Sequence, residues 1–185
     1  MDNLNYQPSF QKALFLDRDG IINVDHGYVS KIKDFEFVEG IFDLVKLFSK
    51  TGYLIFIVTN QSGIGRGYYS EEDFSRLTQW MKKKFQENGI QIEGIYYCPH
   101  APDANCNCRK PKTGMIEEAL KSYPLDLSAS WVIGDKQSDI DLADAAHIGH
   151  SIAIGNRKIE NAEYNFSSIN ECKRFLEENP AIINA

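Results

Sequence analysis

Acidic residues follow two apolar runs of the chain, one at residues 13–17 and one at 130–135. Asp17 and Asp19 stand at the end of the first run, and Asp135 closes the second. Hard divalent cations such as Mg²⁺ prefer oxygen ligands, and a bound cation cancels the repulsion between carboxylates and an anionic phosphate ester. The pattern therefore predicts a magnesium site formed by Asp17, Asp135 and the backbone carbonyl of Asp19.

The same residue types fit the steps of phosphate monoester hydrolysis. A carboxyl group with a pKa of roughly 3.9 is ionised at neutral pH, so Asp17 can attack phosphorus without a base. Asp19 can protonate the leaving oxygen and later deprotonate the water that hydrolyses the aspartyl phosphate. Thr59 and Lys110 stand at or after other apolar runs and can hold the oxygens on which charge spreads in the transition state. We predict these four as the catalytic residues.

Such a set requires a scaffold that brings distant segments to one edge. Five continuously apolar runs have the character of strands covered on both faces, and helical patterns separate them. This alternation predicts an α/β fold with a doubly wound, Rossmann-like parallel sheet, in which ligands bind beyond the carboxyl ends of the strands. The expected strands are residues 13–17, 53–60, 94–99, 130–135 and 151–155, and the expected helices run from about 41 until Gly52, from Ser70 to Gly89, and over about 114–123, 138–147 and 170–178.

The length of the chain limits its organisation. Its 185 residues suffice for one domain with a substantial core and are too few for two ordinary domains. We expect a single domain over residues 1–185 whose motif-bearing core spans about 13–155. The connection between the first two expected strands has room for a loop and a helix but not for a separate cap domain. Loops must therefore discriminate among substrates.

Composition narrows the range of partners. With 43% hydrophobic and 25% charged residues, the chain has the composition of a globular, water-soluble protein. Its net charge of -6 disfavours a broad surface for nucleic acid or for an acidic membrane, so neither is expected as a partner. The N-terminus lacks the basic region of a signal peptide, and the apolar run at 13–16 is too short to span a membrane. We expect a cytoplasmic monomer.

Four stretches, "FLDRDGIIN", "VTNQSG", "RKP" and "GDKQSD", resemble the four motifs of haloacid-dehalogenase-type phosphatases. Over residues 13 to about 155, longer pieces, "DRDGIINVDHGYV", "VTNQSGIGRG", "YYCPH" and "CNCRKP", resemble the D-glycero-D-manno-heptose-1,7-bisphosphate 7-phosphatase family. The resemblance implies removal of the 7-phosphate of this phosphorylated sugar in the synthesis of nucleotide-activated heptose, a lipopolysaccharide precursor. It implies magnesium on Asp17, Asp19 and Asp135, and zinc on Cys98, His100, Cys106 and Cys108. The substrate contacts that it implies are Asp25, His26, Gly27, Tyr28, Thr59, Asn60, Gln61, Ser62, Arg109, Lys110 and Lys136.

The loop "CPHAPDANCNCRKPKTG" also supports zinc by its own pattern. C-x-H-x5-C-x-C supplies four nitrogen and sulfur ligands, which is enough for a closed tetrahedral site with no position left for chemistry. Incidental thiols or an oxidised pair are the alternative, but a disulfide between Cys106 and Cys108 would close a small, strained ring. We therefore expect a structural zinc ion that orders the loop and aims Arg109 and Lys110 at the phosphate site.

Arg109, beside the predicted catalytic lysine, indicates recognition of a second anionic group, which suits a sugar bisphosphate. Asp139 has two interpretations, as a partner of Lys110 or the metal waters and as an acidic residue at a helix N-terminus.

Three alternative functions remain. Histidinol-phosphate phosphatases have a similar motif set and zinc loop. A phospho-receiver domain combines Asp, Thr and Lys on a doubly wound sheet, but its phosphorylated aspartate would follow a later strand. A zinc-dependent nucleic-acid-binding module is disfavoured by the acidic composition.

Overall fold

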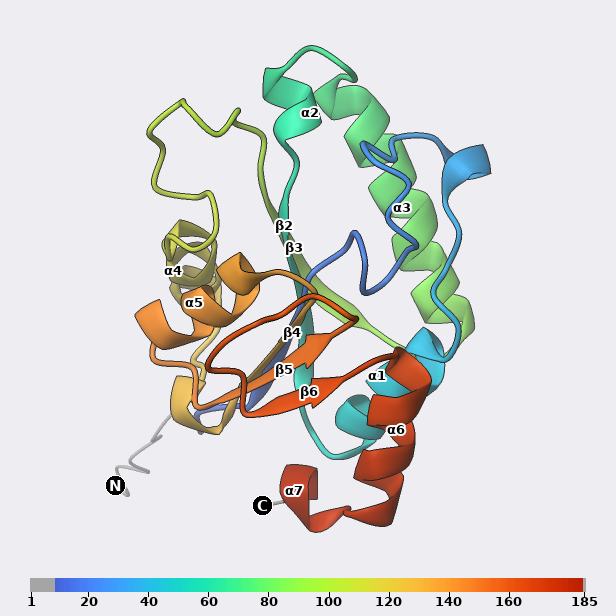
Figure 1. The fold of residues 1–185 in the computed structure, drawn as a ribbon, viewed down its shortest axis with the longest axis vertical. Helices are drawn as coiled ribbons and strands as arrows, with labels where there is room; N and C mark the ends of the chain where they lie inside the picture. Colours follow the sequence, from blue (N-terminus) through green and yellow to red (C-terminus); the bar gives the residue numbers. More distant parts are fainter. Residues whose placement is uncertain (1–8, 185) are drawn as a thin grey trace, which may run out of the picture.

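The computed structural model describes residues 9–184, and its centre is one six-stranded parallel sheet with the order β3-β2-β1-β4-β5-β6 (Figure 1). This confirms the predicted doubly wound α/β architecture. From β1 the chain adds β2 and β3 on one side of the sheet and then β4, β5 and β6 on the other. This change of direction next to β1 creates a crevice at the carboxyl ends of the strands. The strands are β1 (Ala13–Leu16), β2 (Leu54–Asn60), β3 (Ile92–Cys98), β4 (Trp131–Gly134), β5 (His150–Ile154) and β6 (Tyr164–Phe166).

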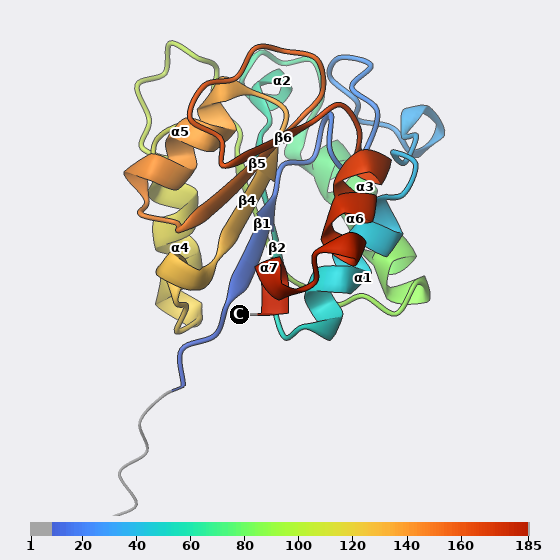
Figure 2. The same ribbon diagram turned by 60° about the horizontal axis from the view of Figure 1, so that its bottom comes forward.

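Two groups of helices cover the two faces of the sheet, as Figure 2 shows. Successive side chains of a strand point to opposite faces, so Leu14 and Leu16 of β1 join one buried cluster while Ala13 and Phe15 join the other. Both faces of β1 are thereby removed from water. One face is covered by α4 (Gly114–Ser122) and α5 (Gln137–Ala145), and the other by α1 (Ile41–Lys50), α3 (Glu71–Glu87) and α6 (Ile169–Glu178).

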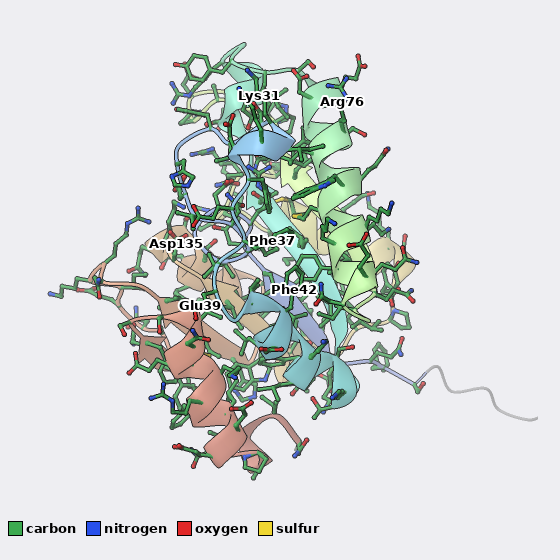
Figure 3. The ribbon with its side chains drawn as sticks, turned by 90° about the vertical axis from the view of Figure 1, so that its right-hand side faces the viewer. Lys31, Phe37, Glu39, Phe42, Arg76 and Asp135 are labelled. Atoms are coloured by element: carbon green, nitrogen blue, oxygen red, sulfur yellow. The ribbon has the colours of Figure 1, made fainter. Side chains whose placement is uncertain are left out.

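The N-terminus of α3 forms as the sequence predicts. The side chain of Ser70 accepts a hydrogen bond from the backbone N–H of Asp73, and the Asp73 carboxylate accepts one from the Ser70 backbone. Further along the helix, Trp80 packs against Phe37, which in turn contacts Phe42 of α1 at a ring separation of 4.8 Å (Figure 3). These aromatic contacts join α3 to α1 and to the loop that follows β1.

One strand begins earlier than predicted, and three short elements were not predicted. The third strand begins at Ile92, two residues before the expected start at Gly94. The edge strand β6 was not predicted, because Tyr164 and Phe166 are only half-buried, Asn165 between them is exposed, and the three form no continuous apolar run. Two short helices, α2 (Ser62–Gly65) and α7 (Ala181–Asn184), were not predicted because four residues carry no helical periodicity.

Short connections surround the carboxyl ends of the strands. Within the described residues, β1 is joined to β2 by loops, a 3-10 helix (Ile32–Asp34) and α1, and β2 is joined to β3 by α2 and α3. The loop between β3 and α4 lies at the same end of the sheet as α2 (Figure 1). None of the helices within residues 9–184 has the length and apolar character that a bilayer span requires.

Candidate active site

The carboxyl ends of β1, β2 and β4 meet at one cavity, because these strands are neighbours in the sheet. Its volume is about 400 Å³, and its walls carry acidic, basic and amide side chains. The lining residues are Asp17, Asp19, Asp25, Gly27, Tyr28, Asn60, Gln61, Ser62, Tyr69, Arg109, Lys110, Lys136, Ser138 and Asp139.

Lys110 forms the buried ionic centre of this cavity. Its Nζ lies 2.8 Å from Oδ1 of Asp17 and 2.7 Å from Oδ1 of Asp139, and it also donates to the carbonyl oxygen of Val58. Burial acts to lower the pKa of Lys110, but the two carboxylates outweigh it and hold the pKa above its usual value. For Asp17, burial is the largest effect and raises the pKa despite the attraction of Lys110. A further cation next to Asp17 would therefore favour the ionised form of this carboxyl group.

Asp139 fulfils both roles that its position in the sequence allowed. One carboxylate oxygen meets Lys110, and the other accepts hydrogen bonds from the backbone N–H groups of Asp135 and Lys136, each at 3.1 Å. The side chain lies so close to β4 that a Cβ atom on Gly134 would be 2.2 Å from its Cβ. Glycine at position 134 thus allows Asp139 to cap the start of α5 and pair with Lys110 at once.

Asp19 is surrounded by hydrogen-bond donors. Its Oδ1 accepts from Arg18 at 2.8 Å and from Asn23 at 3.0 Å, and its Oδ2 accepts from Gln61 at 3.0 Å. Burial acts to raise the pKa of Asp19, but the Arg18 guanidinium and the hydrogen bonds together lower it. The carboxyl group is therefore held as an anion in one orientation at the cavity wall.

The acidic residues beside Lys110 suit a hard cation. Carboxylate oxygens of Asp17, Asp135 and Asp139 lie within 4.8 Å of one another. Burial, followed by repulsion from Asp17, raises the pKa of Asp135, which shows that negative charge is crowded here. Asp135 meets Lys136 at 3.1 Å and Arg157 at 2.9 Å. This oxygen-rich donor set has the chemistry that Mg²⁺ requires.

The loop of residues 98–114, which we call the Cys/His loop, brings four soft ligand atoms together. Sγ of Cys98 lies 2.9 Å from Sγ of Cys108 and 3.5 Å from Sγ of Cys106, and Nδ1 of His100 lies 3.2 Å from Sγ of Cys108. The edges of a tetrahedron around Zn²⁺ are about 3.5–3.8 Å long, since zinc–sulfur bonds are about 2.3 Å. The four residues therefore fit a closed zinc site after a small expansion. Cys172, the fourth cysteine, is buried on α6, away from this loop.

Known proteins match nearly the whole described chain. Residues 13–171 match the family described as polynucleotide kinase 3 phosphatase. A D-glycero-beta-D-manno-heptose-1,7-bisphosphate 7-phosphatase from Helicobacter pylori is 47% identical over 167 residues, which cover 90% of this chain and 94% of that protein. The alpha-heptose counterpart from Campylobacter jejuni is 48% identical over 168 residues, covering 90% and 96%. The chain belongs to the heptose-1,7-bisphosphate 7-phosphatase family. It is a phosphoric monoester hydrolase of the haloacid dehalogenase superfamily.

Solved structures agree with this phosphatase in fold. A D,D-heptose 1,7-bisphosphate phosphatase from B. bronchiseptica superposes with a TM-score of 0.79 at 24% identity, covering 91% of this chain and 99% of that one. A HAD-like phosphatase from Mesorhizobium loti gives a TM-score of 0.79 at 27% identity, covering 96% and 88%. The sheet and its helices are therefore those of the superfamily.

Apart from the four cysteine and histidine residues predicted to hold zinc, the phosphatase gathers the predicted site residues in the cavity with three exceptions. His26 lies outside it, paired with Glu36 at 3.0 Å on the surface. Thr59 is buried and is not among the lining residues, but its hydroxyl accepts a hydrogen bond at 2.8 Å from Nε2 of Gln61, which lines the cavity. Asp135 faces a neighbouring hollow together with Arg157.

Asn60 has a contact that the sequence does not reveal. Its side-chain amide exchanges two hydrogen bonds with the backbone of Lys110, at 3.0 and 3.3 Å. Asn60 thereby fixes the loop segment that carries Lys110.

Two lining residues, Tyr69 and Ser138, were not predicted. The hydroxyl of Tyr69 donates a hydrogen bond to Gln61 at 2.6 Å. In the sequence, Tyr69 stands in a short loop before α3 and belongs to none of the recognised motifs. Its place in the cavity depends on the tertiary fold, so no local signal could have revealed it.

Proposed function

We propose that this phosphatase removes the 7-phosphate of D-glycero-D-manno-heptose 1,7-bisphosphate, in the synthesis of nucleotide-activated heptose, through an aspartyl phosphate on Asp17. The observation that carries the proposal is the cluster of Asp17, Lys110 and Asp139 at the cavity, in a chain nearly half identical to relatives that carry this name. Asp17 Oδ2 is the oxygen that we propose for attack, because Oδ1 accepts a hydrogen bond from Lys110 at 2.8 Å, whereas Oδ2 has only the longer ion-pair contact with Lys136 at 3.9 Å.

The remaining groups act on the oxygens around phosphorus. Lys110 and the Thr59 hydroxyl attract the equatorial oxygens, on which charge spreads as the ester bond breaks. Asp19, an anion in the free protein, takes up a proton when the anionic phosphate binds beside it, delivers that proton to the leaving sugar oxygen and then regains one from the attacking water. Because Asp19 is held by three donors, this carboxyl group has a defined position before the substrate arrives.

We propose Mg²⁺ as the cation held by Asp17, Asp135 and the carbonyl of Asp19, with Asp139 supporting the site through Lys110. When bound, the ion supplies positive charge that offsets repulsion between the carboxylates and the phosphate. The B. bronchiseptica relative holds magnesium and phosphate. We also propose that Zn²⁺ on Cys98, His100, Cys106 and Cys108 has a structural role, and that the protein acts in the cytoplasm, where thiolate ligands stay reduced.

Arg109 is the residue that we propose for the second phosphate. It lines the cavity next to Lys110, and its Nη1 is buried without a hydrogen-bond partner in the described part of the chain. A buried, unpaired guanidinium nitrogen is costly unless a ligand meets it. A bidentate contact with the remote phosphate would satisfy it.

Phosphate release from a set of substrates tests the proposal. The set contains the alpha and beta anomers of heptose 1,7-bisphosphate, the corresponding 7-monophosphate, hexose bisphosphates and histidinol phosphate, each with Mg²⁺. We expect the highest kcat/KM for one heptose bisphosphate anomer. A higher kcat/KM for histidinol phosphate would overturn the substrate assignment and support the alternative histidinol-phosphate activity.

A further inference from the structure

The side-chain amide of Gln61 connects two groups of the proposed mechanism. Gln61 is 2% exposed, and its Nε2 donates to Oδ2 of Asp19 at 3.0 Å and to Oγ1 of Thr59 at 2.8 Å. An amide nitrogen has two hydrogens, and these two contacts use both. One amide group therefore touches the acid/base and a phosphate-binding hydroxyl at the same time.

Tyr69 holds the other end of this amide. Its hydroxyl donates to Oε1 of Gln61 at 2.6 Å. Burial raises the pKa of Tyr69 to about 12, so the hydroxyl keeps its proton at neutral pH and remains a donor. The carbonyl oxygen of the amide is thus held on the Tyr69 side, and the NH2 group faces Asp19 and Thr59.

This orientation determines what Thr59 can do. A threonine hydroxyl has one hydrogen to donate, and here its oxygen accepts from Gln61, so its hydrogen stays available for a phosphate oxygen. In the rotated amide, Oε1 would lie beside Thr59 and take that hydrogen. The same rotation would place Oε1 against the carboxylate oxygen of Asp19.

The position of the Tyr69 ring is fixed by its surroundings. A Cβ atom on Gly63 would lie 2.2 Å from Cε1 and 2.8 Å from Cζ of Tyr69, so glycine provides the space that the ring occupies. The next residue, Ser70, caps α3. Tyr69 is therefore anchored through its ring and through its backbone connection to a long helix.

We infer that Tyr69 is a positioning residue that acts through Gln61 to keep Thr59 a donor to the transferring phosphate and Asp19 fixed at the cavity wall. The inference rests on the proposed aspartyl-phosphate mechanism and goes beyond it, because it gives a role to a residue with no part in bond formation or proton transfer. It also gives Gln61, predicted as a substrate contact, a further role as a link between the two proposed catalytic groups.

The first test replaces only the Tyr69 hydroxyl. Tyr69→Phe keeps the ring and removes the donor, and we expect kcat for an aryl phosphate to fall by roughly 5- to 20-fold, the effect of losing one positioning hydrogen bond. KM should stay within about twofold, because substrate contacts remain. Tyr68→Phe is the matched control, since Tyr68 is adjacent in sequence, 60% exposed, and keeps its ring contact with Tyr28. Unchanged kcat in Tyr69→Phe would overturn the inference.

A double-mutant cycle tests the route through Gln61. In a Gln61→Met background, Tyr69→Phe should change kcat by less than about twofold, because the link is already lost. Losses that multiply in the double variant would mean that Tyr69 acts by packing, and would overturn the inference. The cycle uses an aryl phosphate, so it remains valid if the heptose bisphosphate proves not to be the substrate. The substrate screen on wild-type protein detects that separate failure.

A measurement on wild-type protein requires no folded Tyr69 variant. The side-chain amide resonances of Gln61 are assigned by their loss in Gln61→Met. We expect the two amide hydrogens of Gln61 to exchange with water at least about tenfold more slowly than those of the exposed Gln86. The reason is that each Gln61 hydrogen is bonded to a buried or half-buried acceptor, Thr59 or Asp19. Equal exchange rates would show that the amide is not held and would overturn the inference.

Discussion

Lys110 Nζ lies 2.8 Å from Oδ1 of Asp17, although 93 residues separate the two in the chain. Both side chains are buried, and Asp139 is buried beside them. Lys110→Met would leave two carboxylates without their cation, so we expect the free energy of unfolding to fall by about 3–5 kcal/mol and turnover to be lost on every substrate. Chemical denaturation and phosphate release measure the two effects.

The exposed pair Lys121–Glu118 provides the control for this substitution. Lys121→Met should leave both activity and the free energy of unfolding nearly unchanged, because this ion pair is exposed to solvent. Adding Asp139→Asn to Lys110→Met should restore part of the stability but none of the turnover, because one unpaired buried charge is removed. A Lys110→Met protein as stable as wild type would contradict the buried ion pair as a source of stability.

Asp17→Asn should abolish turnover and leave the fold intact. An amide of nearly the same shape fills the same space, but it is not a nucleophile toward phosphorus. Turnover should fall by at least about 10³-fold, with the circular dichroism spectrum unchanged. Substantial residual activity in pure Asp17→Asn protein would exclude Asp17 as the nucleophile.

Arg109→Ala should discriminate between substrates. We expect a loss of roughly 2–4 kcal/mol in kcat/KM for the heptose bisphosphate and a much smaller loss for the 7-monophosphate, because only the first carries the remote phosphate. Measuring kcat/KM for wild type and variant on both substrates gives the coupling directly. Equal losses would show that Arg109 supports the loop or the reacting phosphate instead.

The two proposed metals should be separable. Removing Mg²⁺ with a weak hard-ion chelator should stop turnover reversibly with little change in melting temperature. Removing Zn²⁺, or replacing Cys106 with Ser, should lower the melting temperature, because the Cys/His loop loses its cross-link. Metal analysis of protein purified under reducing conditions without chelator shows whether zinc is bound. Protein free of zinc with a normal melting temperature would contradict a structural role for zinc.

The capping box of α3 predicts a pH effect on stability. The backbone and side chain of Ser70 lower the pKa of Asp73 below 3.8. Because the pKa of Asp73 is lower in the folded state, its ionised carboxylate contributes stability above the unfolded pKa, and this stability is lost as pH falls through the folded pKa. Asp73→Ala should therefore have a lower melting temperature than wild type at pH 6, and the difference should narrow toward pH 3. Arg76→Ala, on the same exposed face, controls for the surface ion pair between Arg76 and Asp73.

The sequence predicted the strands whose residues are buried on both faces, because continuous apolar runs are a local signal. It also placed Asp17 at a strand end, Asp139 near the start of a helix and Lys110 in the loop after the third strand, and the sheet order brings these segments together. It could not predict β6, which pairs with β5 at the sheet edge through backbone hydrogen bonds that most sequences can form.

The contacts of individual side chains were less accessible. The sequence indicated that Gln61 and Asn60 lie near the phosphate, but not that Asn60 binds the backbone of Lys110 or that Tyr69 binds Gln61. These contacts depend on how α3 and the Cys/His loop pack against the ends of β2 and β3. A linear pattern contains residue types and spacing, whereas hydrogen-bond partners are decided by tertiary geometry.

The pairing of β1 with both β2 and β4 has a consequence for how the chain folds while it is being synthesised. Once β2 has left the ribosome it can cover one edge of β1, but the other edge waits for Trp131 and the residues after it. Until then Asp17 lies on an unpaired strand edge, and the residues that complete its surroundings do not yet exist. A nascent chain therefore cannot assemble this site until most of its length has been translated, and the unpaired edge of β1 is open to association with other chains during that interval.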